Sequence, residues 1–267
     1  MDMKTKFDLT RFGMLLKWDL KTNRRFYLTM PISVAIAQTF IFSMLSLTSV
    51  GMADYQNLLL DEGTAMACFF FIMMMILMAA NICCNVKTKQ SRIAFLMLPG
   101  TLHEKYLVRL FGVTVVAALS FLTGLVFADA MQCLISEMMG ADGYSVALQL
   151  FMPLPSETDT AVRGTLLNSL RSIAIFLSLH SFYLFCGALF RFRPMLLASC
   201  IFIGVTIFFI AVDTVIISNT PLKKLLDSDV FDYLFPAFFL LLTVLFYWAS
   251  FRIFSRMQVI NNKWINL

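Results

Sequence analysis

Charged residues are scarce in this sequence. Only 14% of the 267 residues are Asp, Glu, Lys or Arg, against about 25% in an average soluble domain. Hydrophobic residues reach 60%, and the mean hydropathy is +0.81. A water-soluble core of this size cannot hold so many apolar side chains, so the composition excludes a soluble protein and predicts one that uses lipid as its solvent.

The sequence also lacks the common motifs of catalysis and nucleotide binding. It contains no G-x-x-x-x-G-K-[ST] loop, no H-E-x-x-H and no G-x-S-x-G. Only two histidines are present. His103 lies in a connection, where a solvated position at the membrane surface is expected. His180 lies within a span, where a hydrogen bond between helices is more consistent with its position than contact with a substrate. We therefore expect no enzyme activity, catalytic residue, metal site, cofactor or nucleic-acid partner for this chain.

Long apolar runs dominate what the sequence does contain. Six of them reach the roughly 20 residues that a helix needs to cross the hydrocarbon of a bilayer. They cover residues 28–50, 64–84, 107–128, 166–190, 195–217 and 233–251. None alternates in polarity as a barrel strand would, so the predicted fold class is an all-α integral membrane protein with six transmembrane helices. The spans read as unbroken helices, which disfavours a secondary carrier.

The distribution of charge predicts the orientation. Most of the 21 lysines and arginines lie in the N-terminal segment, in the connections after the second and fourth runs, and in the C-terminal tail. Most acidic residues lie in the other connections. Because basic residues mark cytoplasmic loops, both termini are expected in the cytoplasm. One transmembrane domain would fill residues 1–267: a cytoplasmic amphipathic segment 1–27, a six-span bundle 28–254 and a cytoplasmic tail 255–267.

The N-terminal segment predicts an amphipathic interfacial helix over residues 7–25. On a helical projection, five apolar side chains fall on one arc and the basic side chains fall opposite. The apolar five are Leu9, Phe12, Leu15, Leu16 and Leu20.

The connection between the second and third runs predicts a helix, a break and a second helix. Residues 92–98 are apolar with basic neighbours, and Pro99 and Gly100 interrupt them. Thr101 and Glu104 have the spacing of a capping box, so a new helix should begin there and continue into the third span.

Two further patterns concern the third span and the loop after it. Ser120, Gly124 and Ala128 repeat every four residues, which favours close helix packing, either between two copies or within one chain. Residues 131–139, in the acidic loop that follows, predict a short surface helix.

Residues 95–109 resemble a segment found in membrane subunits of type-2 ABC exporters (ABC-2), especially those of Bacteroidota. The matching residues are Leu98, Pro99, Thr101, Glu104, Lys105, Tyr106 and Arg109. The resemblance implies that this connection is a cytoplasmic coupling helix that docks into an ATP-binding subunit. Leu98, Pro99, Thr101, Glu104, Lys105 and Arg109 would then serve that coupling.

The resemblance also implies the rest of an exporter. ATP and Mg would be bound by a separate ATP-binding subunit, and a second membrane subunit, expected to be another copy, would complete the complex in the bacterial cytoplasmic membrane. Two alternatives stay open: a secondary carrier or channel without an ATPase, and a non-transporting sensor or assembly protein. The sequence assigns no substrate-binding residue.

Overall fold

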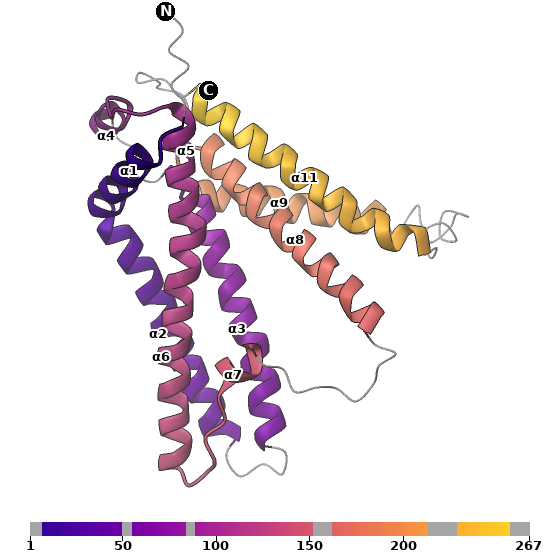
Figure 1. Ribbon diagram of the computed structural model, residues 1–267. Helices are drawn as coiled ribbons and strands as arrows, with labels where there is room; N and C mark the ends of the chain where they lie inside the picture. Colours follow the sequence, from indigo (N-terminus) through magenta and orange to yellow (C-terminus); the bar gives the residue numbers. More distant parts are fainter. Residues whose placement is uncertain (1–6, 50–54, 84–88, 152–161, 213–228, 257–267) are drawn as a thin grey trace, which may run out of the picture. The chain divides into compact units, whose positions relative to one another are not determined.

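A computed structural model describes residues 7–49, 55–83, 89–151, 162–212 and 229–256 as a set of helices (Figure 1). These are α1 (Leu9–Thr22), α2 (Arg24–Ser49), α3 (Tyr55–Ala80), α4 (Lys89–Leu96), α5 (Leu102–Phe111), the π-helical segment η2 (Gly112–Val116), α6 (Ala117–Met138), α7 (Val146–Phe151), α8 (Val162–Leu189), α9 (Pro194–Val212) and α11 (Asp229–Ser255). The described part of the chain thus confirms the all-α class.

Six helices are long and apolar enough to cross a membrane, as predicted. They cover Arg24–Ser49, Tyr55–Ala80, Leu102–Met138, Leu167–Leu189, Pro194–Ala211 and Tyr233–Ser255. The third is longer than the predicted span, because α5 continues into it, as predicted, and α6 extends beyond residue 128 to Met138. Its 37 residues extend roughly 55 Å at 1.5 Å per residue, more than the hydrocarbon thickness. The helix predicted over residues 131–139 is present to Met138, but as the continuation of α6 and not as a surface helix of the loop.

The chain divides into two compact units. Unit 1 contains Met1–Met78 and Leu107–Glu157, and unit 2 contains Ala79–Tyr106 and Thr158–Leu267. The prediction that the whole chain forms a single transmembrane domain stays a prediction.

In unit 1, α2 and α6 pack along each other (Figure 1). Gly124 makes this approach close, since a Cβ placed there would lie 3.0 Å from the Ala35 Cβ. One member of the predicted small-residue repeat therefore packs within the chain.

Before α2, the side chain of Asp8 caps α1 by accepting a hydrogen bond from the Thr10 N–H at 2.9 Å. The interfacial position predicted for α1 stays a prediction.

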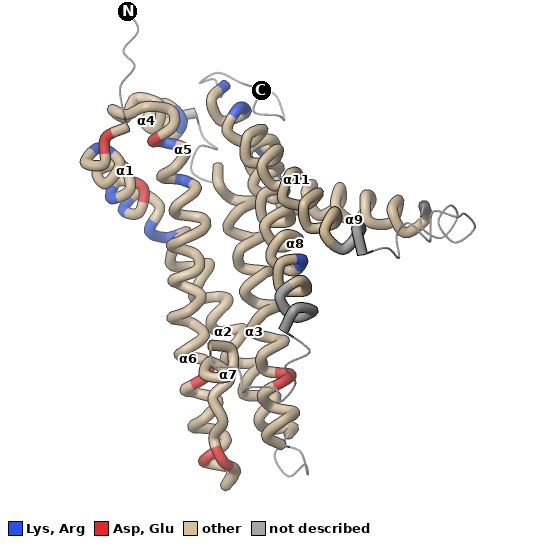
Figure 2. The backbone as a smooth tube through the Cα atoms, turned by 45° about the vertical axis from the view of Figure 1, so that its right-hand side comes forward, with Lys and Arg blue, Asp and Glu red and all other residues tan. Residues whose placement is uncertain are grey.

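Within unit 1 the charges separate along the helices. Figure 2 shows lysine and arginine gathered around α1, together with some acidic residues, whereas the charged residues drawn near α7 are acidic. At that end the Asp129 carboxylate accepts hydrogen bonds from the Ser145 hydroxyl at 2.6 Å and the Val146 N–H at 2.8 Å. These bonds hold the start of α7 against α6.

In unit 2, α8 and α11 form the main helix pair, and α9 packs on α8. Gly187 lets α8 approach the end of α3, because a Cβ there would lie 2.6 Å from the Ala80 carbonyl oxygen. The turn between α8 and α9 ends at Arg193, which has a φ of 46°. Pro194 then opens α9, where its fixed φ suits the first helical position.

Candidate functional site

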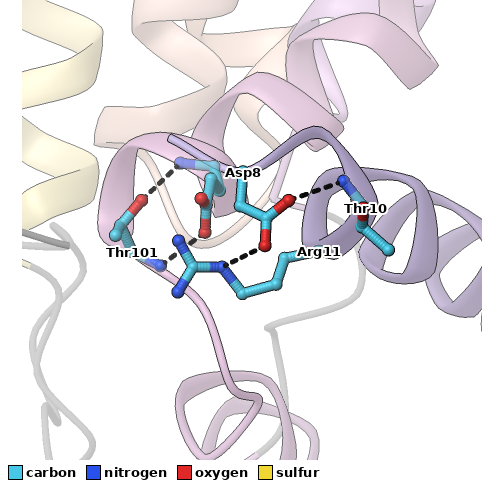
Figure 3. A network of polar contacts seen from close by, with 5 residues as sticks. Asp8, Thr10, Arg11 and Thr101 are labelled. Carbon is cyan, nitrogen blue, oxygen red and sulfur yellow. Dashed lines mark hydrogen bonds and ion pairs between the residues drawn. The ribbon is translucent and has the colours of Figure 1, made fainter. Parts of the chain in front are cut away.

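The connection between the second and third spans folds as α4 and α5, joined by residues 97–101. The predicted capping box starts α5 (Figure 3). The Thr101 N–H donates to Glu104 Oε2 at 2.9 Å, and the Glu104 N–H donates to Thr101 Oγ1 at 3.2 Å. Two backbone donors that an α-helix leaves unpaired at its start are thereby satisfied, and the acidic side chain lies at the positive end of the helix dipole.

Lys105 ties the same turn to the end of α4. Its Nζ donates to the Leu96 carbonyl oxygen at 2.8 Å and lies 5.9 Å from the centroid of the Phe95 ring. A lysine at a helix C-terminus satisfies a carbonyl that has no partner within the helix. The two charged side chains closest to the turn, Glu104 and Lys105, are therefore buried and fix its shape.

An aromatic cluster joins the α4–α5 element (residues 89–106) to α11. The ring centroids of Phe95 and Tyr106 lie 5.9 and 5.4 Å from that of Phe254. Tyr106 also contacts Phe251 at 5.4 Å, and the His103 ring stacks on Phe251 at 4.6 Å. Aromatic pairs at such distances stabilise beyond their buried area. A displacement of this element would therefore act directly on α11.

The outer surface of the α4–α5 element is apolar. Met97 is 81% exposed, Leu102 42% and Ile93 39%. Pro99 and His103 are also exposed. The turn therefore exposes apolar side chains that can contact lipid or another molecule, as do many side chains of the long helices.

A buried arginine adds positive charge to this element. Arg92 on α4 is only 2% exposed. Its burial lowers the pKa of the guanidinium, the nearby Arg191 lowers it further, and Cys83 raises it. Arginine keeps its proton in proteins all the same, so the charge persists beneath the apolar surface.

The six residues predicted for coupling do not all lie in one place. Leu98 and Thr101 are half-buried in the turn, Pro99 is exposed there, and Glu104 and Lys105 point inward. Their predicted contact with an ATP-binding subunit stays a prediction.

Arg109, the sixth, belongs to a buried cluster in unit 1. Its Nη1 lies 3.1 Å from Asp19 Oδ1. The Asp19 carboxylate also accepts hydrogen bonds from the Tyr27 hydroxyl at 2.9 Å and the Asn23 side-chain amide at 2.7 Å. Burial raises the pKa of Asp19, whereas Arg109, Tyr27 and Asn23 lower it by stabilising the carboxylate. In this structure Arg109 thus serves to hold α1 against α5.

The π-helical segment η2 follows this cluster directly. Gly112, its first residue, lies against Tyr27: a Cβ at 112 would overlap the Tyr27 hydroxyl and lie 2.9 Å from the ring carbon Cζ. A π segment often marks a functional position in a helix. Five residues leave the α-helical hydrogen-bond pattern here, although the helix continues through them without a break.

Sequence reasoning missed Asp19, Asn23 and Tyr27. Their spacing, i, i+4 and i+8, puts three polar groups on one face of a helix. That spacing could have indicated a shared polar cluster. Asp19 lies among basic residues in the sequence, however, and this pattern is typical of a solvated helix face.

Comparisons with known proteins add no identification. No protein-family model, curated protein or solved structure matches the chain. Among the described residues, no group of three or more His, Cys, Asp or Glu is placed to hold a metal ion. The functional argument therefore rests on the residues of the chain.

Proposed function

We propose that this chain is the membrane subunit of an ABC-2 type exporter in the bacterial cytoplasmic membrane, with both termini in the cytoplasm. A separate subunit would bind ATP and Mg and hydrolyse the nucleotide. A second membrane subunit, another copy of this chain, would complete the translocation pathway. The resemblance of residues 95–109 to the coupling segment of such exporters supports the assignment.

The α4–α5 element is the observation that carries this proposal. It is short, its turn is held by the Thr101–Glu104 capping box and by Lys105, and it exposes Met97 and Leu102. A coupling segment needs this combination, since a flexible loop would absorb the motion of an ATPase instead of transmitting it. Because α5 continues into the third span, a push on the turn would act on a membrane-crossing helix.

The charge pattern of unit 1 supports the orientation. Lysine and arginine gather around α1, and acidic residues gather near α7 (Figure 2). Under the positive-inside rule, the α1 end faces the cytoplasm. A cytoplasmic ATPase would meet the chain on that side.

The test is to purify the tagged protein from its native membrane and assay ATPase activity in the eluate. The unaltered protein should bring down a stoichiometric ATP-binding subunit, and Met97→Glu should abolish its recovery by placing a charge in the apolar contact. Met138→Glu is the matched control, since Met138 is 86% exposed at the other end of the same long helix.

Two results would contradict the proposal. Unaltered protein that purifies without any ATPase would favour a secondary carrier or a sensor. Equal recovery of the ATPase with Met97→Glu and Met138→Glu, in folded protein, would remove the α4–α5 element from the contact.

A further inference from the structure

At the end of unit 1 opposite α1, three helices meet: α3, α6 and α7 (Figure 1). Gly63 of α3 packs on Val146 of α7, since a Cβ at Gly63 would lie 2.6 Å from Val146 Cγ2. The Val146 N–H in turn donates to the Asp129 carboxylate of α6 at 2.8 Å. These contacts place Gly63, Val146 and Asp129 at one height along the helices of unit 1.

Exposed carboxylates mark where the hydrocarbon ends near this height. Asp61 and Glu62 precede Gly63 on α3, and both side chains are exposed. A carboxylate that faces lipid is costly within the hydrocarbon, so the apolar layer ends no farther out than these two residues. From Asp129, α6 continues to Met138, which adds roughly 13 Å at 1.5 Å per residue. The headgroup layer is only about 5–8 Å thick on each side, so the end of α6 projects into water.

This projecting end of α6, residues 131–139, is apolar although lipid does not reach as far as Met138. We call it the α6 tip. Leu134 is 54% exposed, Met138 86% and Met139 52%. Leu134 and Met138 are four residues apart and therefore share one face of the helix. Neighbouring exposed apolar side chains that lipid does not cover are typical of a surface that contacts a protein.

The α6 tip is held in a fixed shape. The Tyr55 hydroxyl of α3 donates to Ser136 Oγ at 2.8 Å. The helix ends at Gly140, whose φ is 77°, and the Ala141 N–H donates to the Ser136 carbonyl oxygen at 3.0 Å. Glycine in this left-handed conformation is a regular way to end a helix. The exposed side chains thus lie on an ordered support, which reduces the entropy that a partner must overcome on binding.

The charges around the α6 tip determine which kind of partner suits it. Residues 55–63 and 129–151 contain no lysine or arginine. Their exposed charged residues are Asp61, Glu62, Glu137 and Asp142. A second copy that presented the same tip would place acid against acid, which disfavours self-association. A partner that carries lysine or arginine around an apolar patch complements both the charge and the hydrophobicity of the tip.

We propose that the α6 tip is a docking site for a protein on the side of the membrane opposite α1. The partner contacts Leu134, Met138 and Met139 through apolar side chains, and it pairs with Glu137 and Asp142 through lysine or arginine. This proposal goes beyond the exporter function and uses no residue of the α4–α5 element, so it stands whether or not an ATPase binds there.

Photo-crosslinking with p-benzoylphenylalanine in the full-length chain tests first whether the tip leaves the membrane. The probe replaces Met138 or, as a control, Leu119, which is 59% exposed on the same helix and lies on the membrane side of Asp129. In bilayers of phosphatidylethanolamine and phosphatidylglycerol, the probe at position 119 should form lipid adducts and the probe at position 138 should not. Lipid adducts of equal yield at both positions would overturn the proposal.

The same probe in cells that make the protein tests the partner. Irradiation should join position 138 to one other protein, and mass spectrometry should place the contact in an apolar segment that carries lysine or arginine. Glu137→Gln combined with Asp142→Asn should lower the adduct yield roughly three- to tenfold, because it removes the acidic groups. Glu137→Asp combined with Asp142→Glu is the matched control, since it keeps both charges and should keep the yield.

Four results in cells would overturn the proposal. An adduct between two copies, an adduct within the chain, or no adduct at position 138 would each exclude a separate protein partner. An equal adduct yield in the neutral and the charge-conserving variants would exclude pairing with lysine or arginine. Recovery of the ATPase in the pull-down should be unchanged in both variants, so the failure of either proposal is distinguishable from the failure of the other.

Discussion

The two buried polar clusters solve the same physical problem in different ways. In unit 1, the Asp19 carboxylate is surrounded by three donors, from Arg109, Tyr27 and Asn23. In unit 2, His180 has one partner and leaves Nε2 without another among the described residues. The unit 1 residues and His180 are buried, whereas Tyr247 is half-buried.

The difference between them reflects the different costs of burying a charged group and a neutral one. A buried charge without partners is so costly that a fold retains it only when it is paired. A neutral group can lack a protein partner at lower cost, especially where a small molecule supplies one. The paired cluster therefore joins α1 to α5, and the contact between His180 and Tyr247 joins α8 to α11.

The largest expected effect comes from breaking the pair in unit 1. Arg109→Met leaves the Asp19 carboxylate buried without its countercharge, which should lower the free energy of unfolding by about 3–5 kcal/mol. Thermal unfolding of the purified protein measures this loss. Arg24→Met, at an exposed position at the start of α2, should change stability by less than about 0.5 kcal/mol. Equal losses in the two variants would show that the pair does not stabilise α1.

Gly112→Ala should have the next largest effect. Its Cβ would overlap the Tyr27 hydroxyl, and the resulting strain should cost about 1–3 kcal/mol. Gly13→Ala in α1 is the control, since a Cβ there meets nothing within 4 Å; it should stabilise the protein by about 0.5–1 kcal/mol through helix propensity. Tyr27→Phe combined with Gly112→Ala should be less harmful than the sum of the two single changes. Additive losses would contradict a direct contact.

Thr101→Ala tests the capping box at the start of α5. The loss of the bond from the Glu104 N–H to Thr101 Oγ1 should cost about 1 kcal/mol, and Thr101→Ser should restore most of it by keeping the hydroxyl. Thermal unfolding gives the stability, and the ATPase pull-down shows whether a loosened turn still binds its partner. A serine variant as unstable as the alanine variant would exclude the hydroxyl as the cause.

The smallest expected effect comes from removing the Ser250 hydroxyl, which is fully buried beside the Tyr106 hydroxyl. Ser250→Ala should lower the free energy of unfolding by up to about 1 kcal/mol, because it removes the hydrogen bond between these two side chains. Thermal unfolding measures the loss. Ser181→Ala, at a buried serine that donates to the Ser178 carbonyl oxygen at 2.9 Å within its own helix, is the control, and an equal loss in both variants would contradict a role for the contact with Tyr106.

Local patterns in the sequence predicted local structure well. The six apolar runs became six long helices, and the spacing of Thr101 and Glu104 became a reciprocal capping box. Both outcomes depend on residues close together in the chain, so their physics is visible without a fold. The π-helical segment is the exception, because Gly112–Val116 carries no recognisable signal and its packing against Tyr27 is tertiary.

The roles of the charged residues were harder to predict. Glu104, Lys105 and Arg109 are predicted to serve coupling to a partner subunit, and nothing in the sequence indicates that all three are buried within the chain. In the sequence alone, a basic or acidic residue near a membrane surface is equally consistent with a solvated side chain and with a side chain paired inside the protein. The answer depends on which side chains of other elements come within hydrogen-bonding distance.

The sequence by itself determined the solvent of this protein, the number of its spans and the start of α5, since hydropathy and capping act over a few neighbouring residues. Only the tertiary structure decided that Arg109 meets Asp19, and that His180 meets Tyr247 across 67 positions of the chain while Nε2 stays unmatched among the described residues. The reason is physical: a buried polar atom acquires its partner only when the helices around it have packed.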